Sequence, residues 1–236
     1  SFTRREAPDR WDVIAIAVAD IDGNGTLDLV LGSPDGGSVW LGDGKGNFNQ
    51  VSPFGLDFEN ATGLSLADVD RDGDLDLIAS SVRGAIVYKN RGDGMFTDGK
   101  ATITSLTVRS TAVADIDGDG DLDVVTAITG QPNRVYKNDG KGAFTEYGPR
   151  LGSWATTDIV LGDMDRDGDL DVVEGNYGQP NRIYFNDGTG WFTDSGLALG
   201  NECTNAIAVI DVDCDGDLDI LEGNSSTFDK IYRNDG

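Results

Sequence analysis

Histidine is absent from the 236 residues of this sequence. Ser-His-Asp and Cys-His catalytic arrangements are therefore excluded, and so is a zinc site built on imidazole. No stretch of about 18 consecutive apolar residues is present, so we expect no membrane insertion. The first ten residues, SFTRREAPDR, do not have the pattern of a signal peptide, which we expect to have been removed or to lie outside this sequence.

Basic residues are also scarce, because 18 lysines and arginines face 42 aspartates and glutamates and the formal net charge is -24. More than half of the acidic residues lie in five short motifs described below. Divalent cations bound at those motifs would reduce the negative charge without reversing its sign. We therefore expect neither nucleic acid nor an anionic membrane surface as a partner.

Only two cysteines occur, Cys203 and Cys214, and a predicted strand separates them. A strand rises about 3.3 Å per residue, so the two thiols should lie on the order of 20 Å apart. This separation is too large for a disulfide. We expect free thiols.

What the sequence has in abundance is one acidic motif, D-x-[DN]-x-[DN]-G-x-x-D, which occurs five times. Its first residues are separated by 48, 47, 48 and 48 positions. Repeats of this length stack into one architecture, so we expect a single domain over 1–236. The motifs occupy 20–28, 68–76, 115–123, 163–171 and 211–219.

Each repeat shows four short, β-branched segments bounded by Gly, Asp, Asn and Pro, and none is long enough for a helix. The first segment precedes the motif, the second begins at its last residues, and the fourth centres on a phenylalanine. Four short antiparallel strands in a repeat of this length predict an all-β protein, with each repeat forming one blade of a β-propeller. The predicted first strands are Ile14–Ala19, Gly63–Ala67, Val108–Ala114, Asp158–Gly162 and Asn205–Ile210, and the phenylalanines are Phe48, Phe96, Phe144 and Phe192.

The two ends of the sequence are complementary. The last residues, Asn234-Asp235-Gly236, begin a turn that elsewhere continues as G-x-F-T, and the first residues are Ser1-Phe2-Thr3. We predict a closed ring of five blades, in which the N-terminal strand completes the last blade and leaves no exposed sheet edge. The alternatives are a fragment of a larger ring and a subunit that completes a ring by association.

The five acidic loops have the composition of a calcium site. Ca²⁺ prefers six to eight oxygen ligands in a flexible cage, whereas Mg²⁺ prefers a strict octahedron that keeps waters. Side chains at motif positions 1, 3, 5 and 9 can converge, together with the backbone carbonyl at position 7, and glycine at position 6 permits the reversal of the chain. The candidate ligands are Asp20, Asp22, Asn24, Thr26 and Asp28; Asp68, Asp70, Asp72, Asp74 and Asp76; Asp115, Asp117, Asp119, Asp121 and Asp123; Asp163, Asp165, Asp167, Asp169 and Asp171; and Asp211, Asp213, Asp215, Asp217 and Asp219.

We therefore expect about five Ca²⁺ ions, one per blade. The alternative is a set of Asp-rich surface turns that bind nothing, but carboxylates at such close range repel one another without a cation. The first loop carries Asn24 at position 5 and has one charge fewer. It should bind calcium most weakly.

These loops, together with the N-x-x-G-x-F turns, resemble the FG-GAP/VCBS-type repeats of integrin-like β-propellers. The resemblance covers all five repeats. It implies loops that bind Ca²⁺ and a propeller that serves in adhesion, carbohydrate binding or scaffolding.

A ligand is expected on the face opposite the acidic loops, where the connections differ between repeats. An exposed aromatic ring beside polar side chains can stack against a sugar, but such rings can also fill gaps between blades. The arginines of the two P-N-R segments can contact a ligand or pair with acidic groups of the protein. The candidate ligand-binding residues are Trp11, Trp154, Tyr177, Arg134, Arg182 and Phe228.

These expectations together predict a calcium-binding, non-enzymatic binding or adhesion module with a protein or carbohydrate ligand. A calcium-dependent lectin is the alternative. A polysaccharide lyase or hydratase is less favoured, because the only candidate acid–base pair, Glu174 and Glu222, occupies equivalent positions of two repeats and reads as structural. We expect a monomer that is extracellular or at the cell surface, where millimolar Ca²⁺ suits such loops.

Overall fold

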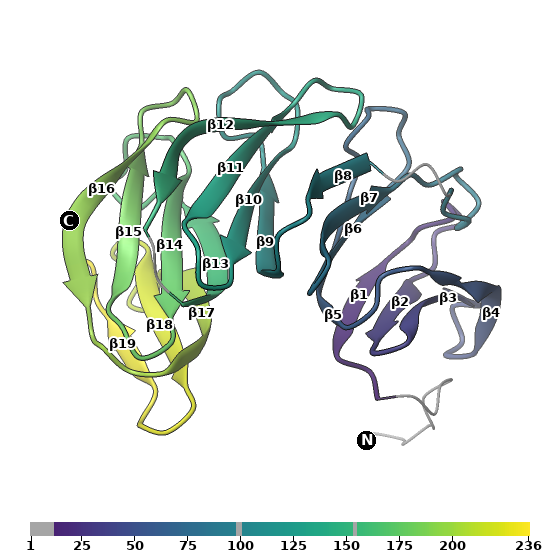
Figure 1. Cartoon of the computed structure of the whole chain (residues 1–236), viewed down its shortest axis with the longest axis horizontal. Coiled ribbons are helices and arrows are strands. Elements are labelled where there is room, and N and C mark those ends of the chain that lie inside the picture. The colour runs from purple at the N-terminus through teal and green to yellow at the C-terminus, as the bar shows by residue number, and fades with distance from the viewer. Residues whose placement is uncertain (1–11, 98–100, 153–154) are drawn as a thin grey trace.

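The computed structural model describes residues 12–97, 101–152 and 155–236. All regular structure in these ranges is β-strand, and the nineteen strands form five antiparallel sheets in chain order (Figure 1). The all-β prediction is thereby confirmed, with one sheet for each acidic motif. Within the same ranges, no helix is present that has the length and apolarity to traverse a bilayer.

Each sheet is a meander of consecutive strands. Sheet 1 contains β1 (Ala15–Ala19), β2 (Asp28–Ser33), β3 (Gly36–Gly42) and β4 (Phe48–Leu56). Sheet 2 contains β5 (Ala61–Ala67), β6 (Asp76–Ser81), β7 (Gly84–Tyr88) and β8 (Ala101–Thr104), and sheet 3 contains β9 (Val108–Ala114), β10 (Asp123–Ile128), β11 (Asn133–Asn138) and β12 (Phe144–Leu151). Sheet 4 contains β13 (Thr156–Gly162), β14 (Asp171–Asn176), β15 (Asn181–Asn186) and β16 (Phe192–Leu199), and sheet 5 contains β17 (Thr204–Ile210), β18 (Asp219–Asn224) and β19 (Lys230–Tyr232).

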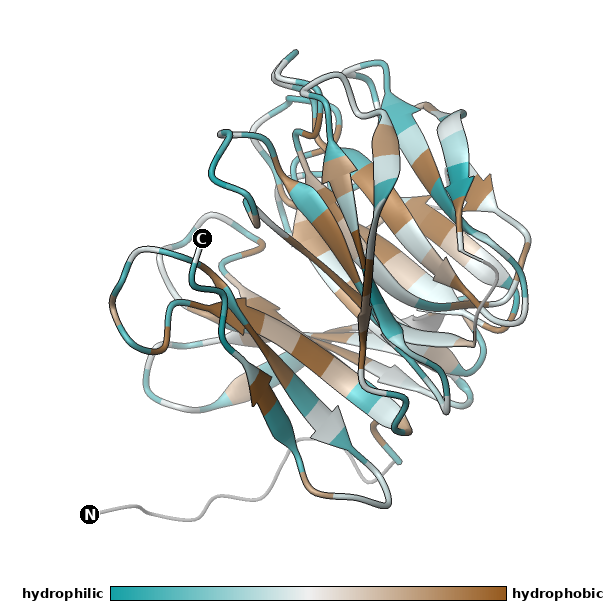
Figure 2. Ribbon diagram, turned by 90° about the vertical axis from the view of Figure 1, so that its left-hand side faces the viewer, coloured by the Kyte–Doolittle hydropathy of each residue, from teal (hydrophilic) through white to brown (hydrophobic). Residues whose placement is uncertain are grey.

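The sheets pack face to face, which explains the composition of the strands. Every residue of β6, β10 and β14 is buried, because these second strands lie between two neighbouring sheets. The apolar residues run through the strands of successive sheets in Figure 2. The first strands β1, β5, β9, β13 and β17 pack on one another in sequence.

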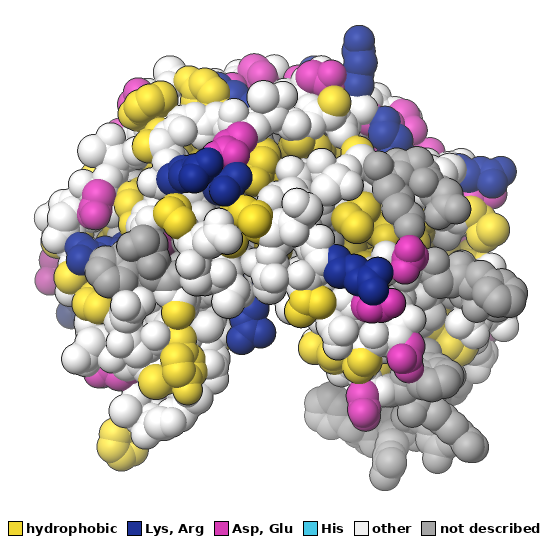
Figure 3. Space-filling model, viewed as in Figure 1, with side chains coloured by type: hydrophobic (Ala, Val, Ile, Leu, Met, Phe, Trp, Pro, Cys, Tyr) yellow, Lys and Arg dark blue, Asp and Glu magenta, His cyan; other side chains and the backbone are white. Residues whose placement is uncertain are grey.

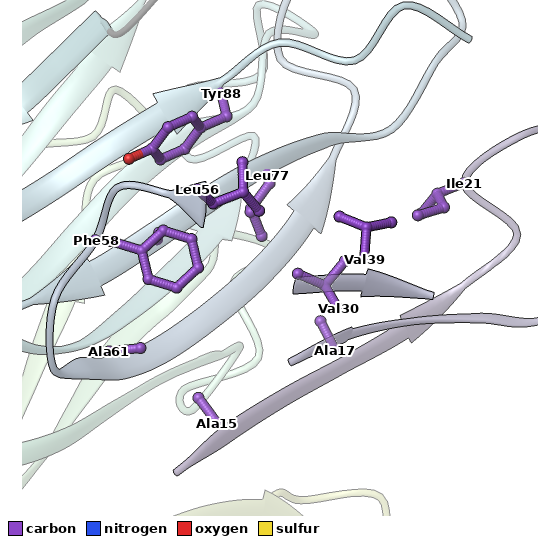
Figure 4. Packing of buried hydrophobic residues seen from close by; sticks show 11 residues of the cluster. Ala15, Ala17, Ile21, Val30, Val39, Leu56, Phe58, Ala61, Leu77 and Tyr88 are labelled. Carbon is purple, nitrogen blue, oxygen red and sulfur yellow. The ribbon is translucent and has the colours of Figure 1, made fainter. Parts of the chain in front are cut away.

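Apolar clusters fill the spaces between neighbouring sheets. Between sheets 1 and 2, Val30 and Val39 face Leu77, and the ring of Phe58 meets that of Tyr88 edge to face at a centroid distance of 5.8 Å (Figure 4). Burial of such a side chain contributes about 1.5–3 kcal/mol relative to exposure. The clusters repeat between sheets 2 and 3, sheets 3 and 4, and sheets 4 and 5, so each sheet is stabilised mainly by its neighbours.

The expected fourth strands need one correction. They begin at Phe48, Phe144 and Phe192 and are not centred on them, and Phe96 precedes the fourth strand of sheet 2. The reason is that the phenylalanine ends the turn and packs inward, as Phe192 does between sheets 3 and 4. The predicted first strands agree with β1, β5, β9, β13 and β17 to within two residues at each end.

The described residues form an open arc and not a closed ring (Figure 1). The space-filling view shows an indentation between the two ends of the arc (Figure 3). Apolar side chains are exposed at both ends, with Ile16 59% and Val18 50% exposed on sheet 1, Ile231 59% exposed on sheet 5, and Val212 41% exposed in the connection between β17 and β18. The segment expected to complete the last blade lies within residues 1–11, outside the described ranges, so closure stays a prediction.

Candidate metal centre

The five acidic motifs form the connections between the first and second strands of the five sheets, and we call them loops 1 to 5. In each loop the glycine at position 6 has a φ between 87° and 97°, a backbone conformation that residues with a side chain rarely adopt. Its N–H donates to Oδ2 of the aspartate at position 1 at 2.7–3.1 Å in all five loops. The carboxylate at position 1 is therefore held over the loop by the loop's own backbone.

The aspartate at position 9 anchors each loop to its sheet. In loop 3, Asp123 accepts the N–H of Ile116 at 3.3 Å through Oδ2 and the N–H of Asn138 at 2.8 Å through Oδ1. The same two bonds occur in the other loops. All five of these aspartates are buried, so the position 9 carboxylate is held in a fixed place beneath each loop.

Three carboxylates converge in each loop. Their oxygen atoms lie within 4.8 Å of one another. The groups are Asp20, Asp22 and Asp28; Asp68, Asp70 and Asp76; Asp115, Asp117 and Asp123; Asp163, Asp165 and Asp167; and Asp211, Asp213 and Asp219.

Two observations show that these groups fit a cation. The buried Oδ1 atoms of Asp68, Asp70 and Asp163 have no hydrogen-bond partner, although an unpaired buried oxygen is costly. Burial raises the pKa of Asp76 to about 6, and the like charges at positions 3 and 5 add to this effect. Burial likewise raises the pKa of Asp123 and that of Asp171 to about 6. A hard cation would satisfy the free oxygens and reverse these pKa shifts.

Loop 1 differs from the others at position 5. The Nδ2 of Asn24 donates to Asp22 Oδ2 at 2.8 Å, and the Oδ1 of Asn24 accepts from both the N–H and the hydroxyl of Thr26. The amide thus engages a carboxylate oxygen that a cation would otherwise take. This contact agrees with the expectation that the first loop binds most weakly, which itself stays a prediction.

Cationic side chains at the end of the third strand were missed by the sequence analysis. Lys89 Nζ lies 2.7 Å from Asp70 Oδ2 and Lys137 Nζ lies 2.6 Å from Asp117 Oδ2, while Arg233 pairs with the position 3 aspartate of loop 5. Burial would raise the pKa of Asp117, but the ion pair with Lys137 holds it below its ordinary value. The signal was present as a basic residue at one position in three repeats.

Loop 4 has a phenylalanine, Phe185, where loops 2, 3 and 5 have this cation. Burial raises the pKa of Asp165, and the charges of Asp167 and Asp163 raise it further. Loop 4 is therefore a densely charged loop without the basic neighbour of loops 2, 3 and 5.

An asparagine that ends the third strand was also missed. Asn138 Nδ2 donates to the carbonyl oxygen of Val69 at 2.7 Å, in the preceding loop, and to that of Leu122 at 3.0 Å, in its own loop. Asn90, Asn186 and Asn234 make the same pair of bonds. Each loop from 1 to 4 is thus held by the next repeat. The N of the repeated Y-x-N sequence was its only signal.

The candidate ligand-binding residues are not gathered into one site. Tyr177 is 49% exposed and Phe228 is 93% exposed, and no ring contact between them is present among the described residues. Arg134 pairs with Glu146 at 2.7 Å, and Arg182 donates to the carbonyl oxygen of Leu197 at 3.4 Å, so both make contacts within the protein.

Trp11 and Trp154 lie outside the described residues, and their placement stays a prediction. The predicted free thiols are confirmed, with Cys203 half-buried and Cys214 exposed.

The two glutamates considered as an acid–base pair are buried between sheets. Asn133 Nδ2 donates to Glu174 Oε1 at 2.6 Å, and Asn181 Nδ2 donates to Glu222 Oε1 at 2.5 Å. Glu174 has no exposed surface, and burial raises its pKa to about 7. The repeated contact with an asparagine of the preceding sheet makes each glutamate part of an inter-sheet network.

Two solved structures have a similar fold. The first is from work on recognition of non-reducing terminal N-acetylglucosamine by an Agrocybe aegerita lectin, with 23% identity and a TM-score of 0.61 over 90% of this chain and 61% of that chain. The second is the Vibrio cholerae biofilm matrix protein Bap1, with 22% identity and a TM-score of 0.53 over 83% of this chain and 30% of that chain. The chain thus spans about three fifths of the lectin and less of Bap1. At these identities the likeness shows the fold alone.

No curated protein matches the sequence at a significant level. The model of the FG-GAP-like repeat matches residues 20–79, 72–126, 115–174 and 163–222. Each match runs from one acidic loop to just beyond the next, and together the matches cover most of the chain. The protein belongs to the FG-GAP-like repeat family.

Proposed function

We propose that each acidic loop binds one Ca²⁺ ion through the side chains at positions 1, 3, 5 and 9 and the carbonyl oxygen at position 7. The observation that carries this proposal is the convergence of carboxylate oxygens, several of them buried without a partner. Bound calcium would neutralise the loop and link its carboxylates, while the strands and the inter-repeat asparagines hold the ligands in place. Five occupied loops would stabilise the folded protein by mass action.

The experiment is a count of bound ions with a matched loss in single loops. Equilibrium dialysis with ⁴⁵Ca²⁺ should give about five ions per chain, as the loop count implies. Replacing the position 1 aspartate of loop 4, Asp163→Asn, should remove one of them. The control is Asp187→Asn, in an exposed turn of the same repeat, which should leave the count unchanged. A count near zero would overturn the proposal.

We also propose that residues 1–236 form a single domain whose arc closes, with the segment around Phe2 completing sheet 5. Phe96, Phe144 and Phe192 each pack against the cluster between their own sheet and the preceding one. The equivalent place between sheets 4 and 5 is a cavity of about 300 Å³ whose apolar lining includes Ile183, Phe185, Leu199 and Tyr232. A phenylalanine from a strand paired with β19 would fill it.

Strand register gives a direct test of closure. Phe185 pairs with Thr193 in sheet 4, so the same register would place Thr3 opposite Arg233. Directly opposed residues on neighbouring antiparallel strands have Cα atoms about 4.5–5.5 Å apart, which lies within the range that disulfides span.

We would make Thr3→Cys and Arg233→Cys in a chain whose native thiols are replaced by serine. A disulfide within the monomer supports closure. A disulfide only between chains, or none, would refute it.

As a biochemical role, a rigid and non-enzymatic binding or adhesion module is best supported. The supporting observations are the repeat family, the acidic loops confined to one face, and the different connections on the other face. The buried, asparagine-bound Glu174 and Glu222 are poorly placed for catalysis. The lectin and the biofilm matrix protein have this fold, and a calcium-loaded module of this type suits an extracellular or cell-surface location.

The ligand of the variable face would be a protein or a carbohydrate, and a carbohydrate is the second candidate because a lectin shares the fold. A glycan array in millimolar Ca²⁺ and again in EDTA separates these classes. Calcium-dependent binding that is lost in Tyr177→Ala or Phe228→Ala would support a lectin. The matched control is Trp191→Ala, an exposed ring beside the loop face. A blank array would leave a protein ligand as the proposal.

A further inference from the structure

Position 4 of the acidic loops differs between repeats in an alternating way. Loops 1 and 3 have glycine there, Gly23 and Gly118, whereas loops 2 and 4 have Arg71 and Arg166 and loop 5 has Cys214. All five residues have a φ between 60° and 72°, a left-handed conformation that favours glycine. The two arginines therefore occupy an unfavourable backbone conformation. The contacts of their side chains with the next loop indicate why arginine is present at this position.

Arg166 extends from loop 4 into loop 5. Its Nε donates to the carbonyl oxygen of Gly216 at 3.1 Å, and its Nη2 donates to the carbonyl oxygen of Asp215 at 2.9 Å. The same guanidinium pairs with the carboxylate of Asp217. One side chain thus contacts positions 5, 6 and 7 of the next loop, which include the proposed ligand Asp215 and the residue that offers its carbonyl.

Arg71 makes the equivalent bridge from loop 2 to loop 3. Its Nε lies 2.7 Å from Asp121 Oδ1, and its Nη2 donates to the carbonyl oxygen of Asp119 at 3.4 Å. Gly23 and Gly118 have no side chain, so this kind of bridge is missing between loops 1 and 2 and between loops 3 and 4. The arginine bridges therefore join loops 2 and 3 and loops 4 and 5, in addition to the asparagine contacts that all neighbouring repeats share.

We propose that Arg71 and Arg166 couple the loops energetically, so that calcium binds with positive cooperativity within the pairs 2–3 and 4–5. The inference rests on the proposed calcium binding. A cation in loop 4 would bind Asp165 and Asp167, the two neighbours of Arg166 in sequence, and would thereby fix the position of the Arg166 backbone. The guanidinium then holds the backbone of loop 5 in its liganded shape before the second ion arrives, and the effect is reciprocal.

Loop 5 contains its own reporter site, because Cys214 is exposed at position 4. In a Cys203→Ser chain, an environment-sensitive dye attached to Cys214 would report the occupancy of loop 5 during a calcium titration. A double-mutant cycle compares this labelled chain with its Asp165→Asn variant, its Arg166→Gly variant and the variant that carries both substitutions. Arg166→Gly is a mild change, because loops 1 and 3 carry glycine at this position with the same backbone conformation.

The expected result is that Asp165→Asn shifts the loop 5 midpoint to about five-fold higher calcium or more, the lower end of typical coupling. In the Arg166→Gly chain the same substitution should cause no shift. Asp117→Asn in loop 3, which has no arginine bridge to loop 4, should leave the midpoint unchanged in both chains.

An equal shift with and without Arg166, or no shift at all, would overturn the coupling while calcium binding itself is still seen. The absence of any transition at Cys214 would instead overturn calcium binding in loop 5, and the coupling with it. Melting curves of each variant in calcium confirm that the compared chains are folded.

Discussion

Without calcium, the free energy of unfolding should fall as the pH rises. Carboxylates with lowered pKa values have the opposite effect, so this direction is a specific consequence of the structure. Asp76, Asp123 and Asp171 have a pKa near 6 in the fold instead of 3.8, and Glu174 has one near 7 instead of 4.5. A folded-state pKa above the unfolded value means that the folded protein binds more protons. The stabilisation is complete at low pH and is lost as the pH rises through the folded-state pKa.

The magnitude follows from these values. One pKa unit corresponds to 1.36 kcal/mol, so between about pH 5 and about pH 8 each of the three aspartates should cost on the order of 1 kcal/mol and Glu174 roughly 2 kcal/mol. Together they remove a large part of the 5–15 kcal/mol that typically stabilises a domain. Calcium should abolish the aspartate contribution, because the bound cation keeps these carboxylates ionised. It should not abolish that of Glu174, which lies outside the loops.

The assay is urea unfolding followed by circular dichroism across this pH range, at constant ionic strength, in EDTA and in millimolar calcium. We expect a steep decline in EDTA and a shallow one in calcium. Glu174→Gln should remove the remaining decline, because the amide oxygen can still accept the bond from Asn133 while the group no longer ionises. A metal-free stability that does not change with pH, or the same decline in calcium as in EDTA, would refute the reasoning.

Three further outcomes can be checked. Asp117→Ala should lower the melting temperature in calcium more than Thr97→Ala, because it removes a ligand and the partner of Lys137, and equal losses would mean that the third loop is empty. Asn24→Asp should tighten calcium binding to loop 1 by about tenfold, or about 1.4 kcal/mol, in a calorimetric titration. An unchanged affinity would show that the amide contacts of Asn24 do not weaken binding. Calcium affinity of loops 2, 3 and 4 should weaken below about pH 6, because protons compete for the carboxylates of Asp76, Asp123 and Asp171. A flat affinity profile would contradict the raised pKa values of these three groups.

The periodic features of this protein were predictable from the sequence. The repeated motif predicted five similar units, and the apolar segment before each motif placed the first strand to within two residues at each end. Strand formation here depends on local pattern and on turns rich in glycine and aspartate. The converging carboxylates were predictable for the same reason, since positions 1, 3 and 9, or 1, 3 and 5 in loop 4, belong to one short loop. Their spacing within the chain nearly fixes their spacing in space.

Contacts between repeats were decided only by the tertiary structure. The sequence does not show that Asn138 donates to a carbonyl oxygen of the preceding loop or that Lys137 pairs with Asp117. It also does not show that Arg166 donates to the backbone of the following loop. The buried, high-pKa state of Glu174 likewise arises from the sheet packed against it. The strand and loop pattern is a local property that is present within each repeat, whereas these contacts depend on how adjacent sheets are positioned, which only the packed fold determines.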